Sequence, residues 1–170
     1  MKKHYLLFAT ALVLLIGSCA GNSKEKSGEE SGMATVSEAS AVKDEVHGTQ
    51  MLTKADFLDK IMDYEKNPSE WVFKGDKPCI IDFYADWCAP CRITSPILEE
   101  LAQEYKGRIN VYKIDTEKER ELAAIFGIQS IPSFLYVPME GKPTMSSGIA
   151  RTPEETKQMF RDQIAQVLLD

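Results

Sequence analysis

The chain has 170 residues, a formal net charge of −6 and two histidines, His4 and His47. This length accommodates one domain and a tail, and the acidic balance, with no basic run among aromatic residues, argues against a nucleic-acid partner. Both histidines precede the segment expected to fold, so composition excludes a Cys–His or Ser–His–Asp catalytic set inside the domain.

Residues 1–18 are predicted to be a targeting segment. Residues 2–4 form a basic head, and residues 5–16 are an apolar run that is short for a membrane span and typical of a secretory signal. Residues 15–19, Leu-Ile-Gly-Ser-Cys, resemble the lipobox of bacterial lipoproteins. The resemblance implies that Cys19 becomes a lipidated N-terminus held by several acyl chains. A cleaved signal followed by an incidental cysteine is the alternative.

Residues 19–49 are predicted to be a flexible tether, because Gly, Ser, Ala, Glu and Lys dominate there without an apolar period. A chain of this length reaches roughly 30 Å, which would separate a domain over residues 50–170 from the lipid surface.

The domain over residues 50–170 is expected to open with a helix that Thr53 and Asp56 begin and Asn67-Pro68 breaks. Its expected apolar face holds Phe57, Leu58, Ile61, Met62 and Tyr64, with Trp71 and Phe73 packing behind.

The middle of the domain alternates strands and helices. Residues 79–85 read as a central strand, and residues 89–105 as a helix that Pro96 should kink. A second buried strand is expected over residues 109–115, and a short helix over residues 117–126. The apolar face expected for the helix over residues 89–105 comprises Ile93, Ile97, Leu98 and Leu101.

The end of the domain is predicted to hold two strands and a helix. Residues 131–137 and 144–149 are the strands, joined by a turn at residues 138–142. Thr152 caps the last helix, with Pro153 at its first position. The order α-β-α-β-α-β-β-α indicates an α/β domain with a mixed sheet between helices.

The segment Trp87-Cys88-Ala89-Pro90-Cys91 follows the central strand directly. Cys88 is expected at a helix N-terminus, where the helix dipole and a second thiol one turn away lower its pKa to about 7 or below. This arrangement should expose one sulfur, and the pair can switch between dithiol and disulfide. A Cys-x-x-Cys pair is also half of a zinc site. The domain lacks a histidine and has one further cysteine, so no metal or other cofactor is expected.

Cys79 is the cysteine left over once Cys19 is lipidated and Cys88 and Cys91 pair. An odd thiol in an oxidising compartment should be hidden. Because Cys79 starts an apolar strand, we expect it to be buried.

The motif Trp-Cys-Ala-Pro-Cys after Asp-Phe-Tyr-Ala-Asp resembles the thioredoxin family, whose usual motif is Trp-Cys-Gly-Pro-Cys. The resemblance covers about residues 50–170 and implies a thioredoxin fold, with a central mixed β-sheet flanked by helices, and thiol–disulfide exchange. Ala89 departs from the usual glycine, and the tether and the insert around Trp71 lie outside the family pattern. Further positions at matching spacings are Pro96, Lys113, Phe126-Gly127-Ile128, Ile131-Pro132 and Gly148.

The resemblance also assigns roles behind the cysteines. Asp82 corresponds to the buried acid that takes a proton from Cys91, and Lys113 to its partner. A carboxyl in an apolar strand should have a raised pKa, which suits a general base. A solvent-facing aspartate and an ordinary solvated lysine are the alternatives.

The resemblance also implies which residues contact the substrate. Pro132 matches the family's cis-proline, and the backbone of Ile131 would pair with an extended substrate segment. Trp87, Ala89 and Pro90 would form an apolar rim around Cys88.

The leading hypothesis is an extracytoplasmic enzyme that reduces protein disulfides, with Cys88 as nucleophile and Cys91 as resolving thiol. Its place would be the periplasmic side of the cell envelope, lipid-anchored to the membrane, with electrons from a membrane donor. Ala89-Pro90 and Ile131 resemble reducing thioredoxins, whereas oxidases carry Pro-His or similar between the cysteines. The alternatives are an oxidase or isomerase, a cytochrome c maturation reductase, and a redox-inert binding lipoprotein.

Overall fold

A computed structural model describes residues 48–170. The predicted signal segment, the lipidation site Cys19 and residues 19–47 of the predicted tether lie outside the described residues. Within residues 48–170, no helix has both the length and the apolarity that crossing a membrane requires.

The described residues form four strands and four α-helices in the order predicted, preceded by one short strand that was not predicted, which makes five strands in all. The last helix continues as a π-helix over Ile164–Leu168. The elements are β1 Gln50–Met51, α1 Lys54–Lys60, β2 Cys79–Tyr84, α2 Ala89–Glu104, β3 Asn110–Asp115, α3 Arg120–Ile125, β4 Ser133–Val137, β5 Thr144–Ser147 and α4 Pro153–Gln163.

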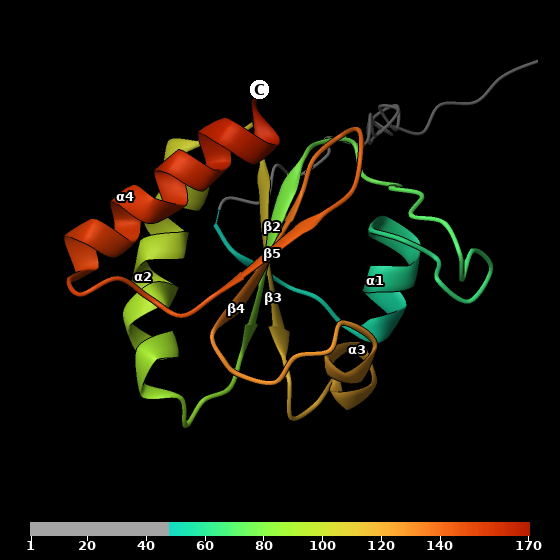
Figure 1. Ribbon diagram of the computed structural model, residues 1–170, viewed down its shortest axis with the longest axis horizontal. Helices are drawn as coiled ribbons and strands as arrows, with labels where there is room; N and C mark the ends of the chain where they lie inside the picture. Colours follow the sequence, from blue (N-terminus) through green and yellow to red (C-terminus); the bar gives the residue numbers. More distant parts are fainter. Residues whose placement is uncertain (1–47) are drawn as a thin grey trace, which may run out of the picture. The chain divides into compact units, whose positions relative to one another are not determined.

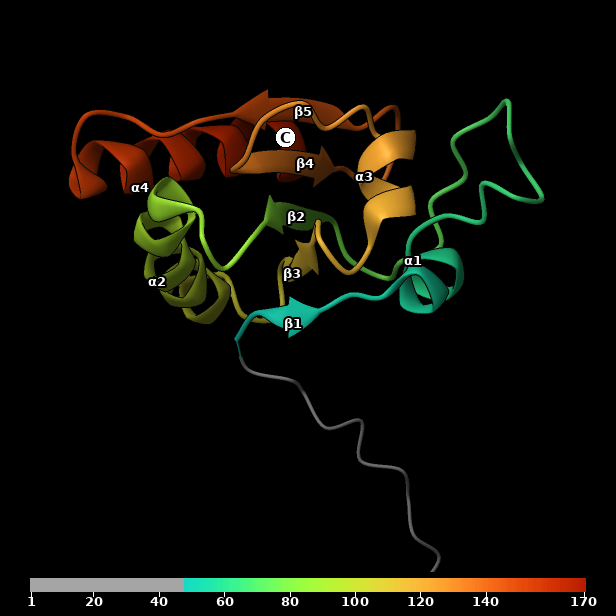
Figure 2. The same ribbon diagram turned by 90° about the horizontal axis from the view of Figure 1, so that it is seen from below.

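The sheet has the strand order β1-β3-β2-β4-β5. β1, β3 and β2 are parallel, and β4 and β5 are each antiparallel to the preceding neighbour in that order. Helices α2 and α4 lie on one side of the sheet, and α1 and α3 on the other (Figures 1 and 2). This mixed sheet between helices confirms the predicted α/β thioredoxin fold.

β2 is the central strand because it is almost wholly buried and apolar. Successive side chains of a strand point to opposite faces, and each face of β2 enters a different apolar cluster. Ile81 and Phe83 pack with α1 and α3, whereas Ile80 packs with α2 and α4. The alternation places Asp82 on the face of Ile80, beneath α2.

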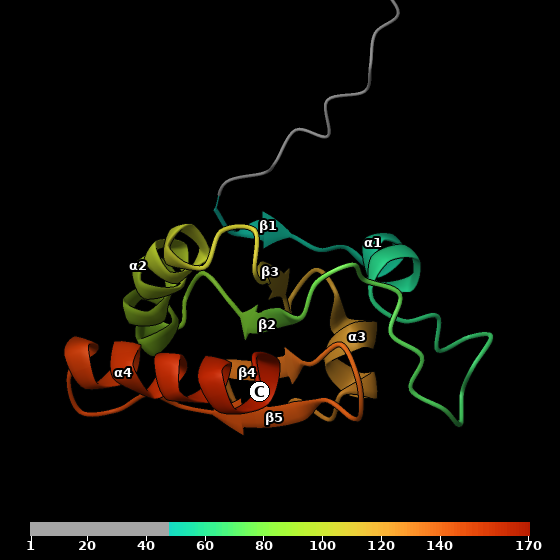
Figure 3. The same ribbon diagram turned by 90° about the horizontal axis from the view of Figure 1, so that it is seen from above.

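The prediction that α1 continues to Asn67-Pro68 is wrong. The capping box of Thr53 and Asp56 starts the helix as expected, but the helix ends at Lys60. The cause is tertiary, because the carbonyl of Ile61 accepts a hydrogen bond from the backbone N–H of Lys74, at 2.9 Å, in the returning chain. Residues 62–78 form a long connection beside α1 (Figure 3), and within it Trp71 and Phe73 pack against the core as predicted.

The prediction that Ile93 faces the core is also wrong. Ile93 is 40% exposed, because the inner side of the first turns of α2 is taken by Cys91 and Thr94. The other three residues predicted for this apolar face, Ile97, Leu98 and Leu101, are buried.

The start of the domain holds two contacts that the pattern did not predict. β1 pairs with β3 through Gln50 and Met51. The Thr49 backbone N–H and hydroxyl both donate to Oε2 of Glu99 on α2, at 3.0 and 2.8 Å. Thr49, which composition assigned to the tether, therefore contacts the folded domain.

Candidate active site

The two cysteines lie where β2 passes into α2. Cys88 is the N-cap of α2, and its Sγ accepts a hydrogen bond from the backbone N–H of Cys91 at 3.2 Å. Sulfur thus takes the place that a serine or aspartate oxygen holds at other helix starts. Cys88 and Cys91 form a disulfide, with their Cα atoms 5.2 Å apart. The cap position, the helix dipole and the amide all favour negative charge on Cys88 once the bond is reduced.

Both cysteines are covered in this disulfide form. Cys88 is 4% exposed and Cys91 is 3% exposed, so the expectation that one sulfur is exposed is wrong for this state. The cause is packing, because Ala85 forms one buried cluster with the two cysteines, and Tyr84 and Ile131 pack against this cluster. Trp87 is the exposed part of the motif, at 66%.

The peptide bond between Ile131 and Pro132 is cis, as predicted. It directly precedes β4, whose first residue, Ser133, pairs with Phe83 near the end of β2. The antiparallel direction of β4 therefore brings Ile131 back to the cysteines. Gly148, at a φ of 81°, donates its backbone N–H to the carbonyl of Pro132 at 2.9 Å, which ties this segment to the end of β5.

Asp82 lies fully buried on the face of β2 beneath α2. Neither carboxyl oxygen has a hydrogen-bond partner among the described residues. Burial raises the pKa of Asp82 to about 7, and the positive charge of Lys113 opposes this only in part. A solvent-facing aspartate is excluded, and a carboxyl that titrates near neutral pH can both accept and return a proton.

Lys113 lies directly across from Asp82 in the register of β2 and β3. Its ammonium nevertheless donates a hydrogen bond to Oγ of Ser95 on α2 and lies 4.4 Å from the centroid of the Tyr84 ring. Lys113 therefore acts on Asp82 through its charge, and no hydrogen bond or ion pair joins the two side chains.

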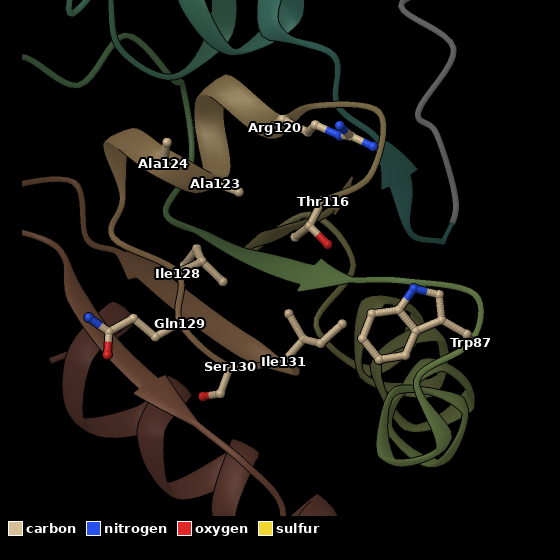
Figure 4. A pocket seen from close by; sticks show the side chains of 9 residues that line it. All are labelled: Trp87, Thr116, Arg120, Ala123, Ala124, Ile128, Gln129, Ser130 and Ile131. Atoms are coloured by element: carbon tan, nitrogen blue, oxygen red, sulfur yellow. The ribbon is translucent and has the colours of Figure 1, made fainter.

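Two pockets are lined in part by residues of this site. One, of about 360 Å³, includes Cys91, Ser95 and Lys113 in its wall. The other, of about 530 Å³, lies between Trp87, α3 and the segment before β4 (Figure 4). Its lining consists of Trp87, Thr116, Arg120, Ala123, Ala124, Ile128, Gln129, Ser130 and Ile131.

Of the residues lining the larger pocket, the sequence predicted only Trp87 and Ile131 as site residues, and Ile128 only as a position at family spacing. The others carry no motif, because three separate segments converge there only in the fold. Arg120 is the one ionisable residue in this lining. Its Nε donates to the carbonyl of Glu117 at 3.2 Å, and no ion pair to Arg120 occurs among the described residues.

The remaining predicted residues lie at their expected places. Ala89 and Pro90 are exposed in the first turn of α2, beside Cys88. Cys79 is a fully buried free thiol, and burial raises its pKa far above the ordinary range. Cys79 is therefore unreactive at neutral pH.

Comparison with known proteins agrees with this geometry. Residues 50–164 match the sequence profile described as Thioredoxin. The chain is 50% identical over 97 residues to a thioredoxin of Borreliella burgdorferi, a match that covers 57% of this chain and 82% of that protein.

Two matches to photosynthetic organisms span shorter segments. The chain is 44% identical over 73 residues to an M-type chloroplastic thioredoxin of Pisum sativum, covering 41% of this chain and 42% of that protein. It is 42% identical over 64 residues to thioredoxin 1 of Nostoc, covering 38% and 60% respectively. Both matches thus span less than two thirds of the relative's own length.

Proposed function

The chain belongs to the thioredoxin family, and from this we infer that it reduces disulfide bonds of other proteins at an extracytoplasmic membrane surface. Family membership and the intact cysteine pair make it a thiol–disulfide oxidoreductase. The observation that carries the proposal is the placement of Cys88 as the cap of α2, packed with the Ile131 that precedes cis-Pro132, over a strand that buries Asp82.

The first step is attack by Cys88. In the dithiol form, the amide of Cys91 and the helix N-terminus stabilise the Cys88 thiolate. This thiolate attacks one sulfur of a substrate disulfide, a mixed disulfide forms, and the other substrate sulfur leaves as a thiolate that takes a proton. Trp87 and the backbone of Ile131 border Cys88 and are suited to hold an extended substrate segment by strand addition.

The second step releases the substrate. The thiol of Cys91 passes its proton to the Asp82 carboxylate, directly or through a water. The Cys91 thiolate then attacks Sγ of Cys88, so that the Cys88–Cys91 bond forms and the bond to the substrate breaks. The substrate leaves as a thiolate and takes up a proton, and the enzyme ends in the disulfide form that the structure shows.

The proposed location rests on the sequence. A basic head, an apolar run and Leu-Ile-Gly-Ser-Cys19 support export and lipidation. A reductant outside the cytoplasm needs a continuous supply of electrons, so we assign it a membrane donor that reduces the Cys88–Cys91 disulfide. The substrates are proteins with accessible disulfides.

The reducing direction is supported by the residues between and beside the cysteines. Ala89-Pro90 supplies no histidine or other cation to stabilise the reduced form further. A disulfide oxidase or isomerase and a cytochrome c maturation reductase use the same exchange chemistry and differ in potential and partner. A redox-inert binding role is disfavoured because the two cysteines are close enough to bond.

Insulin reduction tests the proposal. Purified residues 48–170, with dithiothreitol as electron source, should precipitate the insulin B chain faster than dithiothreitol alone. Cys88→Ser should bring the rate back to that of dithiothreitol. No acceleration by the parent protein, with the Cys88–Cys91 pair shown to be reduced, would overturn the reductase proposal and favour a binding role.

A further inference from the structure

Ser95 lies on α2 four residues after Cys91, so the two side chains share one face of the helix. Both line the pocket of about 360 Å³, together with Tyr84 and Lys113. Ser95 is half-buried, and its hydroxyl accepts a hydrogen bond from the ammonium of Lys113. This hydroxyl is the only hydrogen-bond acceptor that Lys113 Nζ has among the described residues.

The Asp82 carboxyl is a second group with which the Lys113 ammonium could pair. Asp82 is its register partner on β2, and a buried carboxylate attracts an ammonium far more strongly than a hydroxyl does. Yet Lys113 is turned toward Ser95 and lies over the Tyr84 ring, 4.4 Å from the centroid. Neither carboxyl oxygen of Asp82 has a hydrogen-bond partner within residues 48–170. The Ser95 hydroxyl and the Tyr84 ring together hold the Lys113 ammonium in a position where it forms no ion pair with the Asp82 carboxyl.

We propose that Ser95 is a positioning residue that holds Lys113 away from Asp82 and so keeps Asp82 an effective proton acceptor for Cys91. The proposal rests on the proposed reductase function and assigns Ser95 a part in its second step. An ion pair with Lys113 would stabilise the carboxylate, lower its pKa and weaken it as a base. With the ammonium held by Ser95, burial dominates the titration of Asp82.

The other polar groups near Asp82 do not replace this effect. Cys91 on α2 is held in the disulfide. Tyr84 on β2 and Tyr136 on β4 are tyrosines whose pKa is raised, mainly by burial and in part by the charge of Asp82. Both stay neutral at physiological pH, so Lys113 is the charge that can move the titration of Asp82.

The test compares Ser95→Ala with Ser95→Thr by carbon NMR titration of the Asp82 carboxyl in the oxidised protein. Ser95→Ala frees Lys113 to pair with Asp82, so the midpoint should fall by roughly one to three pH units. Ser95→Thr keeps the hydroxyl and should restore the parent midpoint. An unchanged midpoint in Ser95→Ala would overturn the proposal.

A second pair of variants separates positioning from a structural effect of the substitution. In a Lys113→Gln background no cation remains to be held, so adding Ser95→Ala should leave the Asp82 midpoint where Lys113→Gln alone puts it. An equal shift in both backgrounds would show that Ser95 acts through packing and would reject the role proposed for it.

The same variants should alter the resolving step. When preformed mixed disulfides are followed in single turnover, the acid limb of the pH–rate profile of Ser95→Ala should move to lower pH with the Asp82 midpoint. The acid limb of the pH–rate profile of the parent protein should lie near pH 7. The NMR readout needs no activity, so a failed insulin assay would reject the reductase function while leaving the positioning of Lys113 to be judged by titration.

Discussion

Asp82 and Lys113 stand opposite one another on the parallel strands β2 and β3, and no ion pair joins their side chains. The lysine is engaged by Ser95 and Tyr84 instead. The result is a buried carboxyl whose pKa is raised to about 7 by desolvation. Such a group suits the proton transfer that we propose with Cys91, but its burial lowers the free energy of unfolding wherever it is ionised.

We predict that Asp82→Asn stabilises the oxidised protein in a pH-dependent way. The Asp82 pKa is about 7 when folded, against 3.8 ordinarily, so the folded chain binds more protons between these values. The free energy of unfolding should therefore fall as pH rises through this window, by up to about 1.4 kcal/mol per pH unit.

Urea denaturation at pH 4, 6 and 8 measures this effect. Asp82→Asn removes the titration, so its stability advantage should be small at pH 4 and reach a few kcal/mol, roughly, at pH 8. Tyr136→Phe, a change at another buried polar side chain, serves as a control without a carboxyl. An advantage of Asp82→Asn that is equal at all three pH values would contradict the assigned cause.

The order of attack by the two cysteines is a second prediction. Cys88 caps α2 and receives the amide of Cys91, so its thiolate is the better stabilised of the two. Incubation with oxidised insulin should trap a mixed disulfide on Cys91→Ser and none on Cys88→Ser, as read by mass spectrometry. Cys79→Ala is the control, because this buried thiol should contribute nothing to trapping. Equal trapping by the two active-site variants would reject the assignment.

Local signals in the sequence were sufficient for much of this site. The cap at Thr53, the cap and proline at Thr152-Pro153 and the cysteine pair each depend on residues within one helical turn, so short patterns reveal them. The cis bond before Pro132 followed from family resemblance, since an X–Pro sequence alone leaves both isomers open.

The features that escaped prediction depend on tertiary contacts. The end of α1 is fixed by the hydrogen bond from Lys74 to the carbonyl of Ile61. Lys113 donates its hydrogen bond to Ser95 and forms no ion pair with Asp82, and this depends on side-chain positions that strand register does not specify. The larger pocket is assembled from three segments distant in the chain, so no motif marks Arg120.

Arg120 is predicted to favour acidic substrates. It is the one ionisable residue lining the larger pocket and is exposed without an ion pair in the described structure. Disulfide peptides with a glutamate beside the reacting cysteine should show about twofold to fivefold higher kcat/KM than lysine counterparts, because exposed charge pairs contribute up to about 1 kcal/mol.

Charge reversal checks the role of Arg120. Arg120→Glu should invert the preference between the two peptides, and the effect should shrink at high salt. Arg108→Glu makes the same charge change beside Tyr105, at the other end of α2, and should leave the preference unaltered. Equal effects of the two reversals would point to net charge and not to the pocket.

Attachment to the membrane is predicted to depend on Cys19. This residue lies outside the described structure, and the prediction rests on the apolar run and small residues before it. Full-length protein should stay in the membrane fraction after a high-salt wash, whereas Cys19→Ala should be released or incorrectly processed. If the variant is cleaved normally and still resists the wash, the anchor is not a lipid on Cys19.

The last prediction concerns the direction of electron flow. The potential of the Cys88–Cys91 pair should lie nearer the roughly −270 mV of thioredoxin than the roughly −120 mV of a strong oxidase. The helix start and the Cys91 amide stabilise the Cys88 thiolate, but no cation lies between the cysteines to stabilise it further. Ionised Asp82 beneath them opposes negative charge on sulfur.

Arg92 follows Cys91 directly and is a cation that could raise the potential, yet its guanidinium is exposed and donates to the backbone carbonyl of Asp86 at 3.3 Å. Solvent therefore screens its charge, and the reduced form gains little from it. Equilibration of residues 48–170 with glutathione buffers, read by thiol alkylation, gives the potential. Arg92→Ala should change it by only a few millivolts, roughly, since an exposed charge contributes little. A value for the parent above about −180 mV, the isomerase range, would overturn the reducing assignment and support an oxidising or shuffling role.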